Sequence, residues 1–151
     1  MRLSPVVEAA LLRLAVPGHL GSLDGDGYPC ITPLWWLWDG SSFRMSCKPD
    51  RPQVARLRAD ERAFFVVDVE SPQSIDGIRP NWQVKCRGRA VIAVDEGNKW
   101  TDRISAKYLA HEGDRDVRQR RSTEPRVVLH LRPEALVAVG THPDLLPARK
   151  P

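Results

Sequence analysis

The segment 46-SCKPDRPQVARLRADERAFFVVD-68 decides the fold, because it joins a strand end, a tight turn, a short basic helix and another strand. Proline suits the first helical position, and Val54 and Leu57 fall on one face, so a helix is expected from Pro52 to Asp60. The apolar run 63–69 predicts a buried strand. Because the amino end of a helix offers free N–H groups, this corner is a candidate phosphate site.

Hairpin signals dominate the chain before this corner. Three strands are expected there, at 19–23, 28–39 and 42–47. The turns between them are 24-DGDG-27 and Asp39-Gly40. Pro33 falls inside the second strand, which places it at a sheet edge or a bulge. Ahead of the strands, Ser4-Pro5 begins an amphipathic helix that ends before Pro17, with its apolar positions at Val6, Ala9, Ala10, Leu12 and Leu14.

Further strands and helices are expected after the corner. Residues 71–81 form a loop, and 82–94 is a long strand whose apolar residues alternate with polar ones. Gly88 marks a bulge in that strand. The remaining expectations are a helix at 98–113, a solvated loop or helix face at 114–126, strands at 127–133 and 135–140, and a loose tail at 141–151.

These elements predict one domain, residues 1–151, with the helix inside 1–17 at its start. Hairpin-connected strands followed by short helices predict a mainly β, α+β fold: an antiparallel split β-barrel of six to seven strands with short flanking helices. Closure into a barrel removes the exposed edges from a sheet with so many apolar strands.

Composition narrows the class of protein. Hydrophobic residues make up 42% and charged residues 28% of 151, which is typical of a soluble globular domain. No apolar run approaches the roughly 20 residues that span a bilayer, and Glu8 and Arg13 interrupt the N-terminal run, so we expect a cytoplasmic protein without membrane contact. The net charge of +4 suits anionic ligands, but the arginines of 114–126 alternate with acids and lack aromatic neighbours, which argues against nucleic-acid binding.

No metal or nucleophile motif stands out. The three cysteines have no paired spacing, and the four histidines have no ligand spacing, so neither a disulfide framework nor a metal site is expected. A Ser–His–Asp set cannot be argued from the sequence either. This does not exclude an enzyme, because a cofactor can carry the hard chemistry.

The order of these strings resembles the pyridoxamine 5′-phosphate oxidase class of split β-barrel flavoproteins. The resemblance begins with 19-HLGSLDGDGYPCITPLWWLWDG-40 and 43-FRMSC-47 and continues through 54-VARLRADERA-63. It extends to the glycine-bearing strand 87-RGRAVI-92, the helix 104-ISAKYL-109 and a closing hairpin 126-RVVLHLRPEALVAV-139. The resemblance implies a homodimer that binds FMN or the deazaflavin F420 in clefts between its subunits and moves hydride to or from a small organic substrate.

Part of the phosphate-binding set of that family is replaced here. The positions that match its serine, arginine and lysine are Arg51, Pro52 and Gln53, and two further basic positions on the second strand match Ile31 and Trp36. Each lost charge-assisted contact weakens binding by about 1.5–3 kcal/mol, which disfavours FMN and places F420 slightly ahead.

The resemblance implies a set of cofactor contacts on both subunits. The residues expected to bind the phosphate region of the cofactor are Ser46, Cys47, Lys48, Arg51 and Gln53. The residues expected to contact the ring or ribityl chain are Val54 and the strand positions Thr32, Leu34, Trp35 and Trp36. Trp82 or Lys85 would approach from the partner subunit. Purely structural roles stay open for these residues. The tryptophans could pack in the core or at the dimer interface, and the strand face with Lys85, Arg87 and Arg89 could simply be exposed to solvent. The alternative function is a non-redox barrel that binds a small planar ligand or serves a cofactor-free biosynthetic step.

Overall fold

The structure, a computed structural model, describes residues 1–147 and contains one antiparallel sheet of seven strands. The strands are β1 Gly18–Leu23, β2 Pro29–Leu34, β3 Trp36–Trp38, β4 Phe43–Cys47, β5 Arg62–Glu70, β6 Asn81–Val94 and β7 Val127–Gly140. The helices are α1 Pro5–Leu11, α2 Pro52–Ala59, α3 Lys99–Tyr108 and α4 Arg115–Thr123, with short 3-10 turns η1 Glu96–Asn98 and η2 Glu112–Asp114. The predicted fold class is confirmed.

The sheet curls into a half-barrel, and a single bent segment of the chain joins its two edges. Its strand order is β2-β1-β5-β6-β7-β4-β3, so the two edge strands, β2 and β3, are consecutive in the chain with only Trp35 between them. β2 pairs with β1, whereas β3 pairs with β4. The single strand expected at 28–39 is therefore wrong in detail, because the chain bends at Trp35 to cross from one edge to the other. Pro33 lies on edge strand β2, as its missing N–H requires.

The long pair β6–β7 forms the spine of the barrel, and it confirms the bulge at Gly88. The register shifts between Arg87 and Gly88, so that Glu134 of β7 is an extra residue between Pro133 and Ala135. A side chain at Gly88 would collide with the Arg132 carbonyl oxygen. The two strands expected at 127–133 and 135–140, and the closing hairpin, are wrong: β7 runs unbroken through the bulge.

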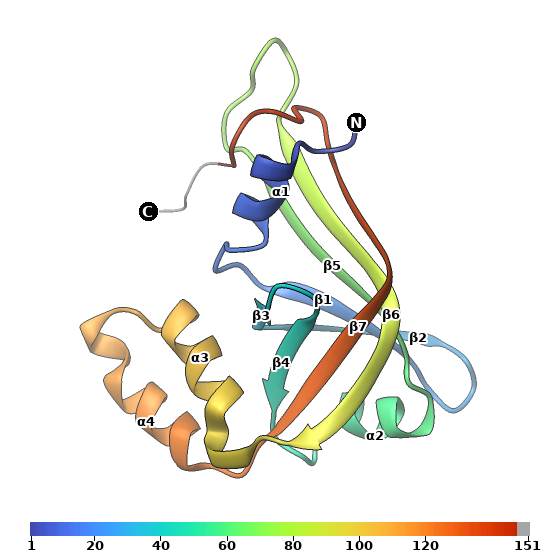
Figure 1. Ribbon diagram of the computed structural model, residues 1–151, viewed down its shortest axis with the longest axis vertical. Helices are drawn as coiled ribbons and strands as arrows, with labels where there is room; N and C mark the ends of the chain where they lie inside the picture. Colours follow the sequence, from blue (N-terminus) through green and yellow to red (C-terminus); the bar gives the residue numbers. More distant parts are fainter. Residues whose placement is uncertain (148–151) are drawn as a thin grey trace.

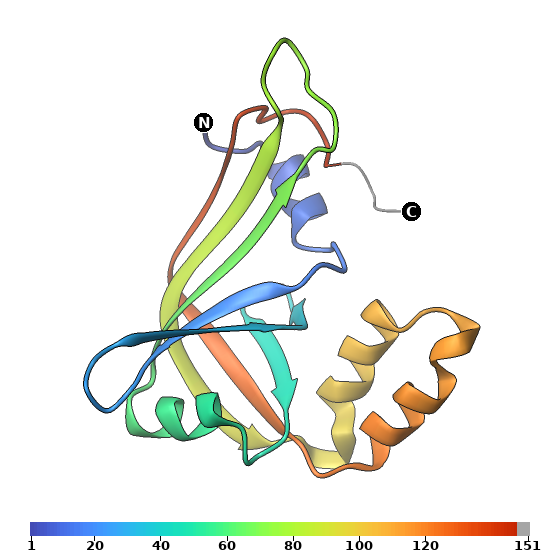
Figure 2. The same ribbon diagram turned by 180° about the vertical axis from the view of Figure 1, so that it is seen from behind.

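The helices lie at the ends and on one side of the sheet. In Figures 1 and 2, α3 and α4 lie next to each other, away from the β1–β2 hairpin, and α2 lies at the end opposite the loop 71–80. The stretch 114–126 contains α4, and α3 ends at Tyr108, earlier than expected. Asp95 begins α3 by accepting hydrogen bonds from the N–H groups of Trp100 and Thr101, at 3.0 and 2.8 Å.

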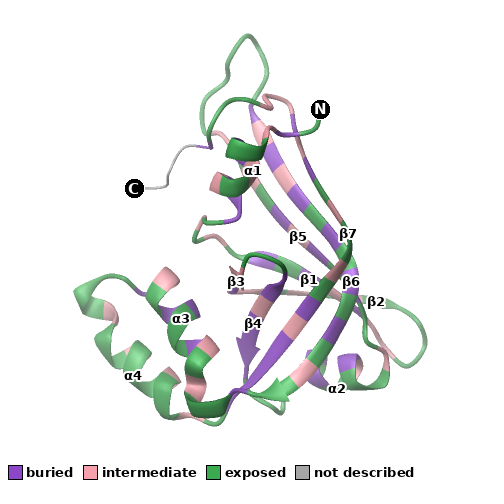
Figure 3. Cartoon of the chain, in the orientation of Figure 1, coloured by how far each residue is buried: buried purple, intermediate pink, exposed green. Residues whose placement is uncertain are grey.

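The core fills the inside of the curl. Trp36, Phe43 and Phe65 are fully buried and pack edge-on or tilted, with ring centroids 4.9–6.0 Å apart. Burial alternates along β5 and β6, and Figure 3 shows this as bands along the strands. The buried strand expected at 63–69 is present as part of β5, but only one of its faces is buried, since Phe64 points outward and is 43% exposed.

The N-terminal helix is shorter than expected and presents another face to the core. It ends at Leu11, and Val7 and Leu11 are its buried residues, whereas Val6 is exposed. Residues 141–147 contain no helix or strand, although the carbonyls of His142 and Leu145 accept hydrogen bonds from the Trp82 indole. The rest of the expected loose tail, 148–151, lies outside the described residues. Within 1–147 no helix is long and apolar enough to span a bilayer.

Candidate functional site

The corner between β4 and α2 is the part of the predicted site that the fold presents to solvent. Lys48 and Arg51 are exposed in the four-residue loop that follows Cys47. Pro52 begins α2 and has no backbone N–H, and the Val54 N–H donates to the Arg51 carbonyl at 2.9 Å. The Gln53 N–H is therefore the backbone donor that remains for a ligand in the first turn of the helix. No acidic side chain lies in the first turn of α2. Asp50, exposed in the same loop, offsets one of the two loop cations, so the positive potential that suits an anion comes from the remaining cation and the helix start.

Ser46 does not face this corner as a free donor. Its hydroxyl accepts a hydrogen bond from Arg126 Nε at 2.8 Å and lies within hydrogen-bond distance of Thr101 Oγ1. Thr101 donates its own proton to Asp95 Oδ2 at 2.7 Å, so the proton between Ser46 and Thr101 belongs to Ser46. Ser46 therefore joins β4 to α3 and β7, and its only proton is already used inside the protein.

Arg126 is a residue of the candidate site that sequence reasoning missed. The residue is 8% exposed, and its guanidinium also donates to the Ser46 carbonyl oxygen at 3.2 Å. Burial lowers the pKa of Arg126, but an arginine stays protonated. The pairing of Cys47 with Val127 brings this charge beside the corner from a distant part of the chain. In the sequence it belonged to a basic stretch assigned to solvent, and only its position at the start of β7 marks it.

Glu124 reduces the positive charge of the corner. Its carboxylate lies 3.6 Å from Lys48 Nζ, 3.7 Å from Arg126 Nη1 and 3.9 Å from Arg120 Nε. Lys48 and Arg120 are largely exposed, so these pairs are weak and a bound anion can replace Glu124 as the partner of Lys48. Next to them, burial raises the pKa of the Cys47 thiol to about 11, which keeps it protonated at neutral pH.

The tryptophans of the bent segment are already engaged. Trp36 is fully buried, and its indole N–H donates to the Val16 carbonyl at 2.8 Å. Trp35 stacks on Tyr108 with ring centroids 4.9 Å apart and planes inclined by 7°, and Arg121 lies 4.9 Å from its ring. Thr32 and Leu34 are half-buried on β2. Of the residues expected around the ring, Val54 and Trp36 belong to the core of this chain.

Trp82 and Lys85 lie on opposite faces of β6. Trp82 is buried, whereas Lys85 is exposed on the outer face with Arg87 and Arg89. Lys85 is nine positions from Val94, which pairs with Val127 beside the corner. At about 3.3 Å per residue, this places Lys85 roughly 30 Å along the strand, out of reach of the corner in its own chain.

Exposed apolar side chains occupy the outer face of the sheet. The register aligns Ile31, Gly21, Phe64, Arg87 and Ala135 in one row across five strands. Ile31 is 63% and Phe64 43% exposed, and Val137 and Val91 on the same sheet are also exposed. Arg87 interrupts the row, but exposed apolar side chains gathered on one face of a sheet are typical of an interaction site.

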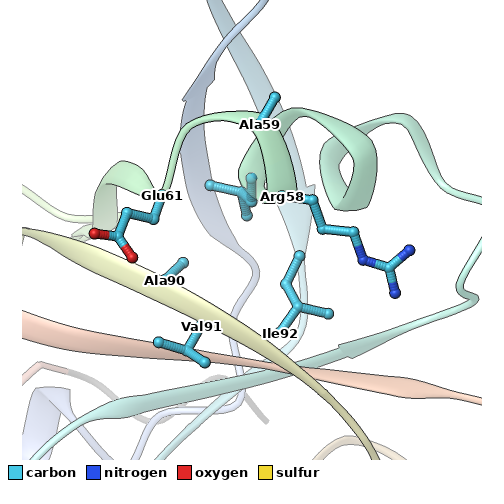
Figure 4. Close-up of a pocket in the computed structure, with 7 residues that line it drawn as sticks. Arg58, Ala59, Glu61, Ala90, Val91 and Ile92 are labelled. Carbon is cyan, nitrogen blue, oxygen red and sulfur yellow. The ribbon is translucent and has the colours of Figure 1, made fainter.

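One surface hollow lies beside α2, and it contains none of the predicted site residues. Figure 4 shows it between the end of α2 and β6, with a volume of about 330 Å³. It is lined by Leu57, Arg58, Ala59, Glu61, Ala90, Val91 and Ile92. The described residues hold no group of three or more histidines, cysteines or carboxylates that could bind a metal ion.

Ser42, His130 and Asp39 lie close together at the start of β4, but they are not arranged as a catalytic triad. Ser42 Oγ lies 2.7 Å from His130 Nε2 and donates to Asp39 at 3.0 Å. Asp39 also accepts a hydrogen bond from Arg44 Nε at 2.7 Å. Because Asp39 contacts the serine and not the imidazole, the arrangement lacks the carboxylate that orients a histidine as a base.

Comparisons with known proteins agree with this fold. The profile of the family described as pyridoxamine 5′-phosphate oxidase matches residues 8–140. A solved structure named F420 reductase is 22% identical, with a TM-score of 0.62, over 84% of this chain and 93% of that one. A FAD-binding protein from Mesorhizobium loti is 19% identical, with a TM-score of 0.65, over 93% and 95%. A heme storage protein from Vibrio cholerae is 13% identical, with a TM-score of 0.65, over 90% and 94%. No curated protein matches the sequence.

Proposed function

The chain belongs to the pyridoxamine 5′-phosphate oxidase family, and from this premise we propose that it is a homodimeric oxidoreductase that uses a flavin-type cofactor. The observation that carries the proposal is the positive β4–α2 corner, where Lys48, Arg51 and the start of α2 face solvent. The cofactor, F420 ahead of FMN, would supply hydride transfer to or from a small organic substrate. The three free thiols fit a reducing compartment, and we expect the cytoplasm.

The residues of the corner fit the phosphate end of such a cofactor. Lys48 and Arg51 supply mobile charges, and the Gln53 N–H supplies a backbone donor. Arg126 holds Ser46 in place and adds a buried charge, which partly replaces the missing basic residues of the family set. These groups bind and orient the cofactor.

The preference for F420 rests on two positions, one on β2 and one on β3, that lack basic side chains. The positions at which FMN enzymes of the family carry basic residues are Ile31, which is exposed on the outer face, and Trp36, which is buried. Neither side chain can pair with a phosphate. The similarity to a structure named F420 reductase supports the same order of preference.

The homodimer would complete the site. The apolar row with Ile31 and Phe64 faces solvent in the single chain, and a second copy can bury it against the same surface related by a two-fold axis. Lys85 lies about 30 Å from the corner along its own strand, so only the Lys85 of a partner subunit can contribute to it.

Titration of the purified protein with F420 and, separately, with FMN tests the proposal, with the ligand fluorescence as the signal. We expect micromolar or tighter binding of one of them, F420 before FMN. Replacing Lys48 and Arg51 together by alanine should raise the dissociation constant at least tenfold, since each charge-assisted contact contributes about 1.5–3 kcal/mol.

The matched control for this titration is the double replacement of Arg115 and Arg118 by alanine on α4. It removes the same two positive charges from an exposed surface outside the corner. Equal losses of affinity in both double variants would mean that the net charge acts at long range, and they would exclude the corner as the specific site. An unchanged dissociation constant in the Lys48/Arg51 variant would exclude it as well.

A second candidate function has its own support. Ser46 has no proton left for a ligand, and Lys48 already has Glu124 as a partner, so the corner can be satisfied without a cofactor. A non-redox barrel that binds another small planar ligand fits these contacts, and one neighbour in fold is named a heme storage protein. Failure of both F420 and FMN to bind would favour this candidate.

A further inference from the structure

Lys107, near the end of α3, is a half-buried amine that the proposed cofactor site does not use. Its Nζ atom donates to the backbone carbonyl oxygen of Trp36 at 3.0 Å and lies 3.4 Å from the centroid of the Trp36 ring. The centroid of the Tyr108 ring lies 5.1 Å away. Trp36 is itself fully buried, and its indole N–H donates to the Val16 carbonyl. The amine of Lys107 therefore packs against an aromatic ring whose position is fixed.

No carboxylate balances a charge on Lys107. Among residues 1–147, no acidic side chain lies within ion-pair distance of its Nζ atom. The charged or titratable groups of its own helix α3 are Lys99, Asp102, Arg103 and Tyr108, and those of the neighbouring elements are Arg121 of α4 and Asp39 with Arg44 next to β3. The Asp102 carboxylate accepts a hydrogen bond from Ser122 at 3.3 Å. Arg103 lies on Trp100, Arg121 lies on Trp35, and Asp39 is paired with Arg44. Cations therefore outnumber the acids in its surroundings.

The hydrogen bonds of Lys107 suit a neutral amine. An ammonium group has three N–H donors, and within residues 1–147 its only acceptor is the Trp36 carbonyl, with the indole face beside it. A neutral amine donates to that carbonyl and keeps its lone pair. The indole face favours the ammonium, but burial without a counter-charge opposes it more strongly, and burial lowers the pKa of Lys107 to about 7.

From this geometry we infer that Lys107 is a nucleophilic amine that captures small carbonyl compounds, aldehydes above all, as a reversible imine. The nitrogen lone pair attacks the carbonyl carbon and forms a carbinolamine. The two N–H hydrogens then leave with the carbonyl oxygen as water, and a carbon–nitrogen double bond remains. The step needs no oxidant, reductant or flavin cofactor. The half-buried setting limits access to small molecules.

Competitive labelling of the whole protein tests this inference, and Lys99 provides an internal control. Lys99 belongs to the same helix and lies 5.4 Å from an indole ring, that of Trp100, but it is exposed. A short pulse of limiting isotope-labelled formaldehyde with cyanoborohydride would trap each imine as a methylated lysine. Peptide mass spectrometry would then give the relative rates at Lys107 and Lys99.

At pH 7 we expect Lys107 to be labelled at least tenfold faster than Lys99. About half of its amine is neutral at that pH, against roughly one in 2,500 for an ordinary lysine with a pKa near 10.4, and partial burial offsets some of this advantage. The ratio should fall to one or below at pH 10.5, where Lys99 is also largely neutral. A ratio of one or less at pH 7 would overturn the inference.

Two variants identify the labelled residue without relying on rates alone. Lys107→Arg keeps a long basic side chain but has no amine that forms an imine, so it should abolish the fast labelling at pH 7, whereas Lys99→Arg should leave it unchanged. Fast labelling that survives in Lys107→Arg would assign it to another lysine and reject the inference. Lys107→Met, which has a similar length and no amine, provides the same test if the arginine variant does not fold.

Discussion

The Ser46 hydroxyl accepts a hydrogen bond from Arg126 Nε at 2.8 Å, although the two residues are 80 positions apart in the chain. The same guanidinium donates to the Ser46 carbonyl oxygen, so one buried side chain fixes both the backbone and the side chain at the end of β4. Through Thr101 and Asp95 the contact continues to the start of α3. The candidate cofactor corner is thus held by a polar network that no local segment contains.

Replacing Arg126 by alanine should destabilise the fold more than any exposed arginine does. The change removes the guanidinium donor from the hydroxyl and the carbonyl oxygen of Ser46, which costs about 1–3 kcal/mol, and the loss of packing adds to this. Urea unfolding at pH 7 measures the difference, and Arg118→Ala on the exposed face of α4 is the control, with an expected change below about 0.5 kcal/mol. Equal midpoints for the two variants would show that the network contributes nothing to stability.

Gly88→Ala should destabilise the barrel through a steric conflict at the bulge. A methyl group at this position meets the Arg132 carbonyl and the Pro133 Cα atom, both of them backbone atoms that cannot move aside easily. We expect a loss of about 1–3 kcal/mol in the free energy of unfolding. Gly113→Ala is the matched control, because an added methyl group there meets nothing within 4 Å. If both variants unfold at the same urea concentration, the bulge tolerates a side chain.

Strands β6 and β7 show which features of the fold can be predicted from the sequence and which cannot. Alternation of apolar and polar residues predicts β6 and its buried face correctly, because the pattern follows directly from strand geometry. Pro133-Glu134 look like a break between two strands, and only the pairing with Gly88 shows that Glu134 is an extra residue in one strand. The bend at Trp35 is hidden for a similar reason, since it is imposed by two different neighbouring strands.

The candidate site likewise has one part that the local sequence predicts and another that depends on strand pairing. The corner with Lys48, Arg51 and the start of α2 follows from local signals, namely a strand end, a proline and a basic helix. The roles of Ser46 and Arg126 depend on the pairing of β4 with β7, so neither residue alone indicates that the other occupies its hydrogen bonds. The partner's contribution depends on a surface between two copies, which local patterns do not determine.

Asp39 should make stability depend on pH in the acidic range. Burial disfavours its ionised form, but hydrogen bonds from Arg44, Ser41 and Ser42 outweigh burial and hold the pKa of the carboxyl well below its ordinary value of 3.8. A depressed pKa in the folded state means that ionised Asp39 stabilises the fold above about pH 4, and that this contribution is lost as the pH falls below that value. The free energy of unfolding of Asp39→Asn should therefore approach that of the wild type between pH 4 and pH 2. A difference between them that is independent of pH would show that the carboxylate charge does not matter.

Phe64→Asp should convert the proposed homodimer into a monomer. The side chain is 43% exposed in the middle of the apolar row. A carboxylate there has Arg87 of the neighbouring strand beside it, but it must lose its hydration once two copies meet face to face, and this costs more than the ion pair returns. Light scattering after gel filtration gives the mass directly. Val6→Asp is the matched control, because Val6 is 70% exposed but lies on α1, away from this face of the sheet, and the variant should keep the wild-type mass. Since a partner subunit would complete the cofactor cleft, the monomeric variant should also lose most of its affinity for F420 or FMN. A monomeric wild type that binds the cofactor tightly would contradict both the dimer and the shared cleft.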